Sequence, residues 1–307
     1  MIRRLVCNTL CVLVFSFGVL CALPESDKRL EAKQLIDSRQ IDKAETMILN
    51  EMMTSPRDPE WITLLAEVRL GQNRTREALK LIDDANELGG MTAARAMLIS
   101  LADSQAGHMD RAEAPIRNAI RLEPDNATAH YFLARLLYTD NRFEESIAES
   151  NKVISLAPDF IRAYENLGLC YEGKYQLEEA KRWYNQAIVR QATSTNKTEW
   201  PMVDLAVLLI HENQVAEAKP YLTQALEINP DNTQALVQMG TVLEADEDLK
   251  GALDMYRAAI HSKQFNQQPG RASAYYKAAL VCRKLGYQDE AKEYFNKFHD
   301  VHDKRNH

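Results

Sequence analysis

The chain has 307 residues, of which 46% are hydrophobic, and it contains only 11 Gly and 10 Pro. This composition excludes disorder as the default and favours long helices over a strand-and-turn protein. The formal net charge of −7 makes nucleic-acid binding a poor expectation, because binding to phosphates needs clustered Lys and Arg.

The first 22 residues have the layout of a secretory signal peptide. A short basic start, Met1-Ile2-Arg3-Arg4, precedes an almost wholly apolar run over residues 5–22, and a charged sequence follows at once. Cleavage near Ala22 is one interpretation. Retention as a membrane anchor is another, because the run is close to the lower limit of roughly 17 residues for a span. Lipidation of Cys21 is a third. In each case we expect an exported body, periplasmic or secreted, that meets a membrane only through an uncleaved leader.

After this leader the sequence predicts helices in pairs. Each unit carries two apolar stretches with helical spacing. In the fourth unit Leu133 and Leu137 lie on a first helix, and residues 140–142 form a polar turn. Ile147 lies on the second helix, which Pro158 ends.

Residues suited to cap helices follow two of the prolines. Asp125-Asn126 comes directly after Pro124, and Asp159 comes directly after Pro158, 34 residues later. Their side-chain oxygens can accept hydrogen bonds from the free backbone N–H groups of the next helix. We therefore expect each to cap the first helix of the following unit.

Small residues return at the same interval of 34. Two helices approach closely only where the side chain at their crossing is small. One column contains Ala32, Ala66, Ser100, Ala134 and Gly168, and a second contains Ala44, Ala78, Ala112, Ser146 and Ala180. The phase slips at residues 194–201 and 264–271, which we interpret as longer loops between units.

A 34-residue helix–turn–helix unit with these columns resembles the tetratricopeptide repeat. The fifth unit carries the resemblance best, with Tyr164, Leu167-Gly168, Tyr171, Ala180, Tyr184 and Ala187 at positions that the family marks. The resemblance implies an all-α fold, an α-solenoid of antiparallel helix pairs wound into a right-handed superhelix over residues 25–303, with a tail at 304–307. The repeats fall near residues 25–58, 59–92, 93–126, 127–160, 161–194, 199–232, 233–266 and 272–305.

The resemblance also implies a concave groove, lined by the first helix of each pair, that binds a protein or peptide. The predicted groove residues are Met97, Leu101, Tyr131, Arg135, Tyr138, Arg162, Glu165, Asn166, Leu169, Trp200, Val203, Val207, Val237, Tyr276 and Arg283. Aromatic side chains would anchor a peptide and Arg would orient it. The alternative for any one of these residues is packing between neighbouring helices.

Some members of the family clamp a C-terminal carboxylate between first helices. The nearest equivalents here are Arg135, Asn166 and Asp204. Asp204 would repel a carboxylate, so we expect no such clamp.

The sequence predicts no enzyme, no cofactor and no metal site. It lacks a Gly-rich phosphate loop and a Cys-x-x-Cys pair, and His211-Glu212 lacks the second His that a zinc helix needs. The functional hypothesis is an exported scaffold or adaptor for protein–protein interactions. The alternative is a tethered structural subunit of an envelope assembly machine, such as a pilus, outer-membrane protein or secretion complex.

Overall fold

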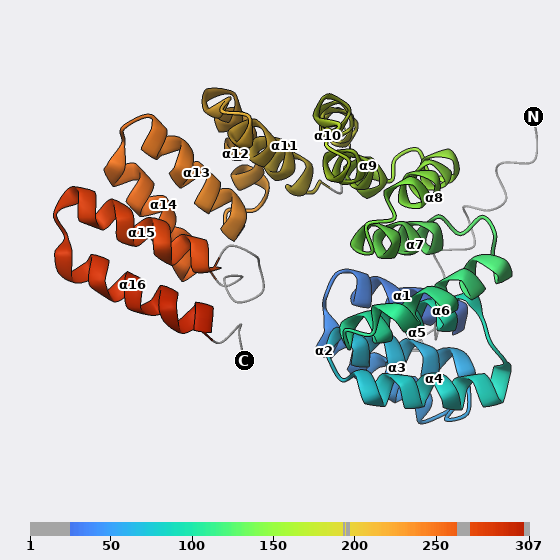
Figure 1. The fold of residues 1–307 in the computed structure, drawn as a ribbon. Coiled ribbons are helices and arrows are strands. Elements are labelled where there is room, and N and C mark those ends of the chain that lie inside the picture. The colour runs from blue at the N-terminus through green and yellow to red at the C-terminus, as the bar shows by residue number, and fades with distance from the viewer. Residues whose placement is uncertain (1–24, 193, 195–196, 263–270, 304–307) are drawn as a thin grey trace, which may run out of the picture. The chain divides into compact units, whose positions relative to one another are not determined.

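A computed structural model of the chain describes residues 25–192, 194, 197–262 and 271–303. The predicted signal peptide or anchor at 1–22 and the tail at 304–307 lie outside these residues. The described part forms sixteen helices and no strand, which confirms the all-α prediction (Figure 1). None of its helices combines the length and the apolar character needed to cross a membrane.

The chain divides into two compact units, with the boundary between Leu122 and Glu123. The first unit contains α1 (Glu25–Asp37), α2 (Ile41–Met52), α3 (Pro59–Gly71), α4 (Thr75–Gly89), α5 (Ala93–Gln105) and α6 (Met109–Leu122). The second contains α7 (Ala127–Thr139), α8 (Phe143–Leu156), α9 (Ile161–Gly173), α10 (Leu177–Gln191), α11 (Trp200–His211), α12 (Val215–Ile228), α13 (Thr233–Ala245), α14 (Leu249–His261), α15 (Arg271–Leu285) and α16 (Gln288–Asp303). Continuity of one solenoid across the boundary stays a prediction.

Within each unit the helices pack in consecutive pairs, such as α3 with α4 and α9 with α10. Short turns join the two helices of a pair, so they run antiparallel, and each second helix also packs against the next first helix. First helices contact one another directly along the second unit, from α7 through α9 and α11 to α15. This is the arrangement of an α-solenoid, as the sequence predicted.

The small columns lie at the crossings within the pairs. Ala134 and Ala112 have no exposed surface. Where the column holds Ser, the hydroxyl crosses the pair. Ser100 Oγ donates to the carbonyl of Ala112 at 2.8 Å, and Ser146 Oγ donates to the carbonyl of Ala134 at 2.7 Å. Residues 100 and 112 precede residues 134 and 146 by one repeat, so the same crossing is bonded from opposite sides in consecutive repeats.

A residue with left-handed backbone marks every turn between the two helices of a pair in the described chain. These residues are Arg39, Asn73, Gly107, Asn141, Tyr175, Asn213, Glu247 and Gly286, with φ between 57° and 84°. Their spacing follows the repeat, including its two slips. The backbone therefore keeps the period even though the residue type at this position varies widely.

The capping predictions had mixed outcomes. Asn126 accepts a hydrogen bond from the backbone N–H of Ala129 at 3.0 Å, which confirms it as the cap of α7. The prediction for Asp159 is wrong, because Phe160 occupies the N-cap position of α9 and no side chain caps that helix. The chain enters α9 through an apolar residue whose ring packs on Tyr131 of α7, with ring centroids 5.0 Å apart.

Candidate protein-binding site

The structure distributes the predicted groove residues over both units. Met97 and Leu101 lie on α5 in the first unit and are partly exposed. The others lie on first helices of the second unit: Tyr131, Arg135 and Tyr138 on α7, Arg162, Glu165, Asn166 and Leu169 on α9, Trp200, Val203 and Val207 on α11, Val237 on α13, and Tyr276 and Arg283 on α15.

Three of these side chains are buried. Asn166 and Val203 have no exposed surface, and Val237 is only 3% exposed. The amide of Asn166 donates to the hydroxyls of Ser146 and Ser150 of α8, each at 2.9 Å. The structure gives these residues packing roles, and any contact with a partner stays a prediction.

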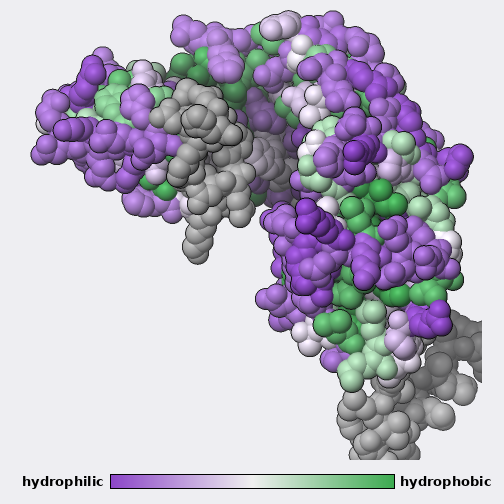
Figure 2. All heavy atoms as spheres, turned by 60° about the horizontal axis from the view of Figure 1, so that its bottom comes forward, coloured by the Kyte–Doolittle hydropathy of each residue, from purple (hydrophilic) through white to green (hydrophobic). Residues whose placement is uncertain are grey.

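The partly exposed residues of α7, α9 and α11 form what we call the first-helix surface. It consists of Tyr131, Arg135, Tyr138, Glu165, Leu169, Asp204 and Val207. Because α7 contacts α9 and α9 contacts α11, these side chains belong to one continuous set of helices. On the face drawn in Figure 2, hydrophilic residues cover most of the molecule and hydrophobic residues show in patches between them.

Arg135 links α7 to α9 on this surface. Its Nη1 lies 3.5 Å from Oδ1 of Asn166, and its guanidinium carbon lies 5.5 Å from the ring centroid of Tyr138. A guanidinium over a tyrosine ring is attracted by the negative face of the ring. These weak contacts hold the cation close to the acidic side chains of α9 and α11.

Glu165 is enclosed although water still reaches it. Its side chain is partly exposed, yet the surrounding protein removes much of its hydration and raises its pKa to about 7. The charges of Arg135 and Arg162 oppose this rise, and the carboxylate of Glu199 adds to it. Residues that are open to water but surrounded by protein lie in hollows, so this combination points to a recessed position on the first-helix surface.

Asp204 has the same character on α11. Burial raises its pKa well above the usual range, and the charges of Glu165 and Glu172 raise it further, while Arg135 opposes them. No hydrogen bond or ion pair reaches the carboxylates of Asp204 and Glu165 from the part of the chain that the structure describes. Glu172 differs, because it accepts a hydrogen bond from the hydroxyl of Tyr184 at 2.8 Å.

We call Glu165, Glu172 and Asp204 the carboxylate cluster. Sequence reasoning placed Glu165 in the groove but considered Asp204 only as an obstacle to a carboxylate clamp. A signal was available, because Asp204 is the one acidic residue in the apolar helix WPMVDLAVLLIH. Among the described residues no group of His, Cys, Asp and Glu has an arrangement that could hold a metal ion.

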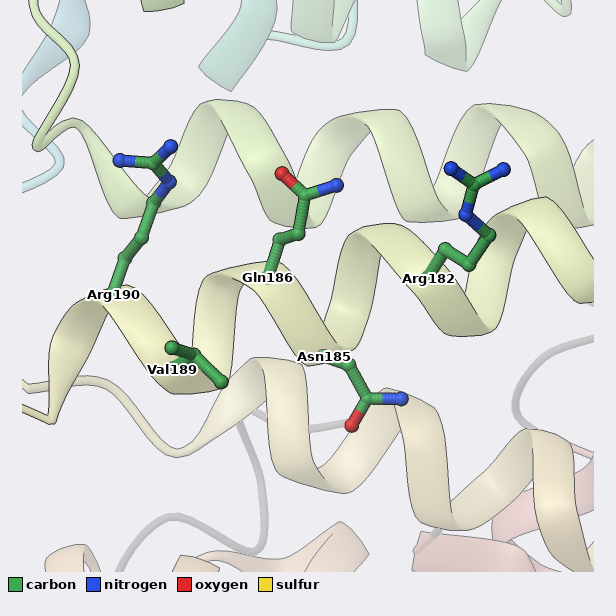
Figure 3. Close-up of a pocket in the computed structure, with 5 residues that line it drawn as sticks. All are labelled: Arg182, Asn185, Gln186, Val189 and Arg190. Atoms are coloured by element: carbon green, nitrogen blue, oxygen red, sulfur yellow. The ribbon is translucent and has the colours of Figure 1, made fainter.

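The opposite type of surface, on the second helices, offers charged groups that already have partners. A hollow of about 570 Å³ on α10 is lined by Arg182, Asn185, Gln186, Val189 and Arg190. Figure 3 shows the two arginines and Gln186 in a row along one side of the helix, with Val189 and Asn185 pointing away from them. Arg182 pairs with Glu179 at 2.7 Å, and the guanidinium carbon of Arg190 lies 4.6 Å from the ring centroid of Tyr164.

At the end of the second unit, α15 exposes two further predicted residues. Tyr276 is 42% exposed, and its ring lies 5.3 Å from that of Phe298 on α16. Arg283 is also exposed. The two residues are thus accessible, but they lie two first helices beyond the carboxylate cluster.

Comparisons with known proteins give relatives of several kinds. The chain is 26% identical over 159 residues to the type IV pilus assembly protein PilF of Pseudomonas aeruginosa, covering 50% of this chain and 60% of that protein. It is 25% identical over 181 residues to the human protein O-mannosyl-transferase TMTC3, covering 58% of this chain and 19% of that protein. The chain therefore spans less than two thirds of the length of these curated relatives.

Solved structures agree on the fold. A tetratricopeptide repeat protein from Parabacteroides merdae superposes with a TM-score of 0.61 at 14% identity, covering 83% of this chain and 98% of that one. The structure from the functional characterization of Pseudomonas aeruginosa PilF gives 0.58 at 20% identity, covering 68% and 91%. At these identities the likeness concerns the fold alone.

Family models for the tetratricopeptide repeat match residues 97–159, residues 209–274, and residues 161–191 and 272–298. The matches fall in both units and on the helix pairs described above. The chain belongs to the tetratricopeptide repeat family, consistent with a scaffold for protein–protein interaction.

Proposed function

We propose that the chain is an exported, non-enzymatic scaffold that holds a partner protein or peptide against the first-helix surface of its second unit. The observation that carries the proposal is the contrast between Asp204 and Arg182. The first-helix surface presents recessed carboxylates without ion partners, whereas the charged groups of the α10 hollow are already paired. Groups left unpaired in a recess are available to a ligand.

The first-helix surface also supplies contacts of other kinds. Tyr131 and Tyr138 offer aromatic faces, and Leu169 and Val207 offer aliphatic ones. Aromatic and aliphatic anchors surrounded by polar groups are typical of peptide-binding surfaces. Because the helices that carry these residues pack on one another, binding should require little ordering of the protein.

Site-specific photo-crosslinking tests the surface. A photoreactive amino acid is placed at Leu169 of α9 in one variant and at Val189 of α10, which is 72% exposed, in the other. We expect protein adducts in the native cell from position 169 and not from position 189. Val207→Arg should abolish the adducts at 169, because a long charged side chain would fill the recess beside α9. Adducts that persist in this folded variant would contradict the proposal, as would adducts from 189 alone.

Export is part of the proposal and rests on the layout of residues 1–22. A fusion of these residues to a reporter that is active only outside the cytoplasm tests it. Replacing the basic pair Arg3 and Arg4 by Glu should lower export, because the basic start directs the leader. Activity equal to that of a leaderless fusion would contradict export.

A second candidate function is favoured by the likeness to PilF, which is named as a type IV pilus assembly protein. On this hypothesis the chain is a tethered subunit of an envelope assembly machine and keeps its leader. N-terminal sequencing of the protein from membranes separates the two functions. Retention of residues 1–22 and co-purification with a multi-protein envelope complex would favour the subunit, and a soluble chain that begins near Ala22 would favour the free scaffold.

A further inference from the structure

We propose that the carboxylate cluster binds a cationic group of the partner, the ammonium of a Lys or the guanidinium of an Arg. The inference rests on the proposed function and names the chemistry that the scaffold recognises. Glu165 and Glu172 come from α9 and Asp204 comes from α11, two helices in direct contact. The site is therefore held by the packing of the solenoid and not by a loop.

The first argument is the missing partner of Asp204. An ionised carboxylate that is enclosed by protein is costly unless a cation or several hydrogen bonds compensate it. In the described residues Asp204 has neither, and its nearest charges include two more carboxylates. The arrangement is unfavourable for the folded chain alone, and a bound cation would remove the repulsion.

The second argument is that the cations already present do not neutralise the cluster. Arg135 is shared, because it contacts Asn166 at 3.5 Å and lies over the ring of Tyr138. Arg162 is exposed at the start of α9 and faces Tyr131 and Glu165. Neither guanidinium forms an ion pair with Asp204, so a place for one more cation remains beside α11.

The third argument concerns what surrounds the acidic groups. Tyr138 lies within electrostatic range of Glu172 and Asp204, and Leu169 and Val207 are the partly exposed apolar residues of α9 and α11. A Lys or Arg side chain has an aliphatic stem and a charged end, so it can bury the stem against apolar and aromatic groups while the end meets the carboxylates. A small inorganic cation would use only half of this surface.

Pools of octapeptides test the inference. The peptides are acetylated and amidated, randomised around one fixed central residue, and the pools differ only in that residue: Lys, Arg, norleucine or Glu. We expect the immobilised protein to retain the Lys and Arg pools about tenfold more than the norleucine pool, and the Glu pool least. A further norleucine pool with a free N-terminus distinguishes a side-chain cation from a terminal amine.

Matched variants assign the preference to residues. Asp204→Asn and Glu165→Gln keep the shape and remove the charge, and both should lose most of the preference for Lys over norleucine. Asp84→Asn on α4 and Glu227→Gln on α12 make the same chemical changes at exposed positions and should leave the preference intact. A wild-type protein that does not prefer the cationic pools would overturn the inference, and so would an Asp204→Asn, Glu165→Gln double variant with undiminished preference.

Proton release supplies a readout that a merely structural role would not move. Glu165 faces Arg135 of α7, Arg162 of α9 and Glu199 before α11, while Asp204 faces Glu165, Glu172 and Arg135. A bound cation favours the ionised carboxylates, so calorimetry of a Lys peptide near neutral pH should show protons released to the buffer. The release should disappear in the double variant, and its absence in wild type would count against the site.

The outcomes separate this inference from the proposed function. If the cellular adducts at position 169 depend on Val207 but the pools show no cation preference, the binding surface stands and the cation assignment falls. If the pools show the preference but Val207→Arg leaves the cellular adducts unchanged, the cation site stands and the scaffold function of this surface falls.

Discussion

The ring of Tyr184 on α10 lies directly over Gly168 on α9, where a Cβ would overlap the ring. Tyr256 on α14 covers Gly240 on α13 in the same way. In both pairs the tyrosine hydroxyl donates to a glutamate four residues after the glycine, from Tyr184 to Glu172 at 2.8 Å and from Tyr256 to Glu244 at 2.6 Å. The small column therefore adapts to its neighbour, since Gly faces Tyr where Ala faces Ile in earlier repeats.

Gly168→Ala tests this relationship. We expect a loss of roughly 1–3 kcal/mol in the free energy of unfolding, because the added methyl group overpacks the crossing of α9 and α10. Urea unfolding followed by circular dichroism measures it. The double variant Gly168→Ala, Tyr184→Ile recreates the pairing of Ala66 with Ile82 and should recover part of the loss. Strictly additive effects would show that the ring and the glycine are not coupled.

The left-handed turns predict a gain of stability. Glu247 adopts φ 63° between α13 and α14, a conformation that Gly reaches without steric cost. Glu247→Gly should raise the free energy of unfolding by about 0.5–1 kcal/mol. Asn213 has φ 64° in the equivalent turn and tolerates this region better, so Asn213→Gly is the matched control with a smaller effect. Equal effects at both positions would contradict the explanation.

In the first unit Arg95 is the fully buried cation that joins α3 to the start of α5. Its guanidinium donates to the hydroxyl of Thr63 at 2.8 Å, to Glu60 at 2.7 Å and to the carbonyl of Gly90. Arg95→Met should cost about 3–5 kcal/mol, because the removed charge leaves buried acceptors unpaired. Unfolding followed by the fluorescence of Trp61 measures it in this unit.

The control for Arg95 is Arg76→Met on α4, where the side chain is exposed. This change should alter stability by less than about 0.5 kcal/mol. A similar cost at both positions would show that the loss at Arg95 comes from general charge effects. Arg95→Lys should remain destabilising, since one ammonium cannot reach three separate acceptors in the fork geometry of arginine.

The carboxylate cluster predicts how stability depends on pH. The pKa of Glu165 rises from the ordinary 4.5 to about 7 in the folded chain, so the folded state holds the proton more tightly than the unfolded state. The resulting destabilisation is absent below the unfolded pKa, grows as pH increases, and is complete above about 7. The raised pKa of Asp204 acts in the same direction.

We therefore expect the free energy of unfolding to increase by roughly 1–2 kcal/mol when the pH falls from 8 to 6, after allowance for the partial exposure of both groups. The double variant Asp204→Asn, Glu165→Gln should be more stable than wild type at pH 8 and should lose most of this dependence. Urea unfolding across the pH range measures both. A wild-type protein whose stability instead falls over this interval would contradict the raised pKa values.

The sequence sufficed for the features that recur with the repeat. The interval of 34 and the columns of small residues predicted the helix pairs, since the crossing of two helices tolerates few residue types. The cap formed by Asn126 was also predictable, because an amide next to a proline has few other local roles. Asp159 was not, since the packing of Phe160 on Tyr131 decides how the chain enters α9.

The candidate site was harder to predict because it depends on depth. The spacing placed Glu165, Asn166 and Val203 on first helices, but it could not show that Asn166 and Val203 are enclosed while Glu165 remains open to water. That difference arises from the side chains of neighbouring helices. The left-handed turns also escaped notice, because Tyr175 and Glu247 are residue types that rarely adopt this conformation.

The packing within each unit has a consequence for how the chain acquires its structure. Each helix packs mainly against helices one or two places away along the chain. Low separation between contacting residues favours rapid folding, and ordering can begin at any repeat and spread to its neighbours. A helix pair can therefore assemble as soon as the preceding pair has formed, without waiting for the synthesis of a distant segment.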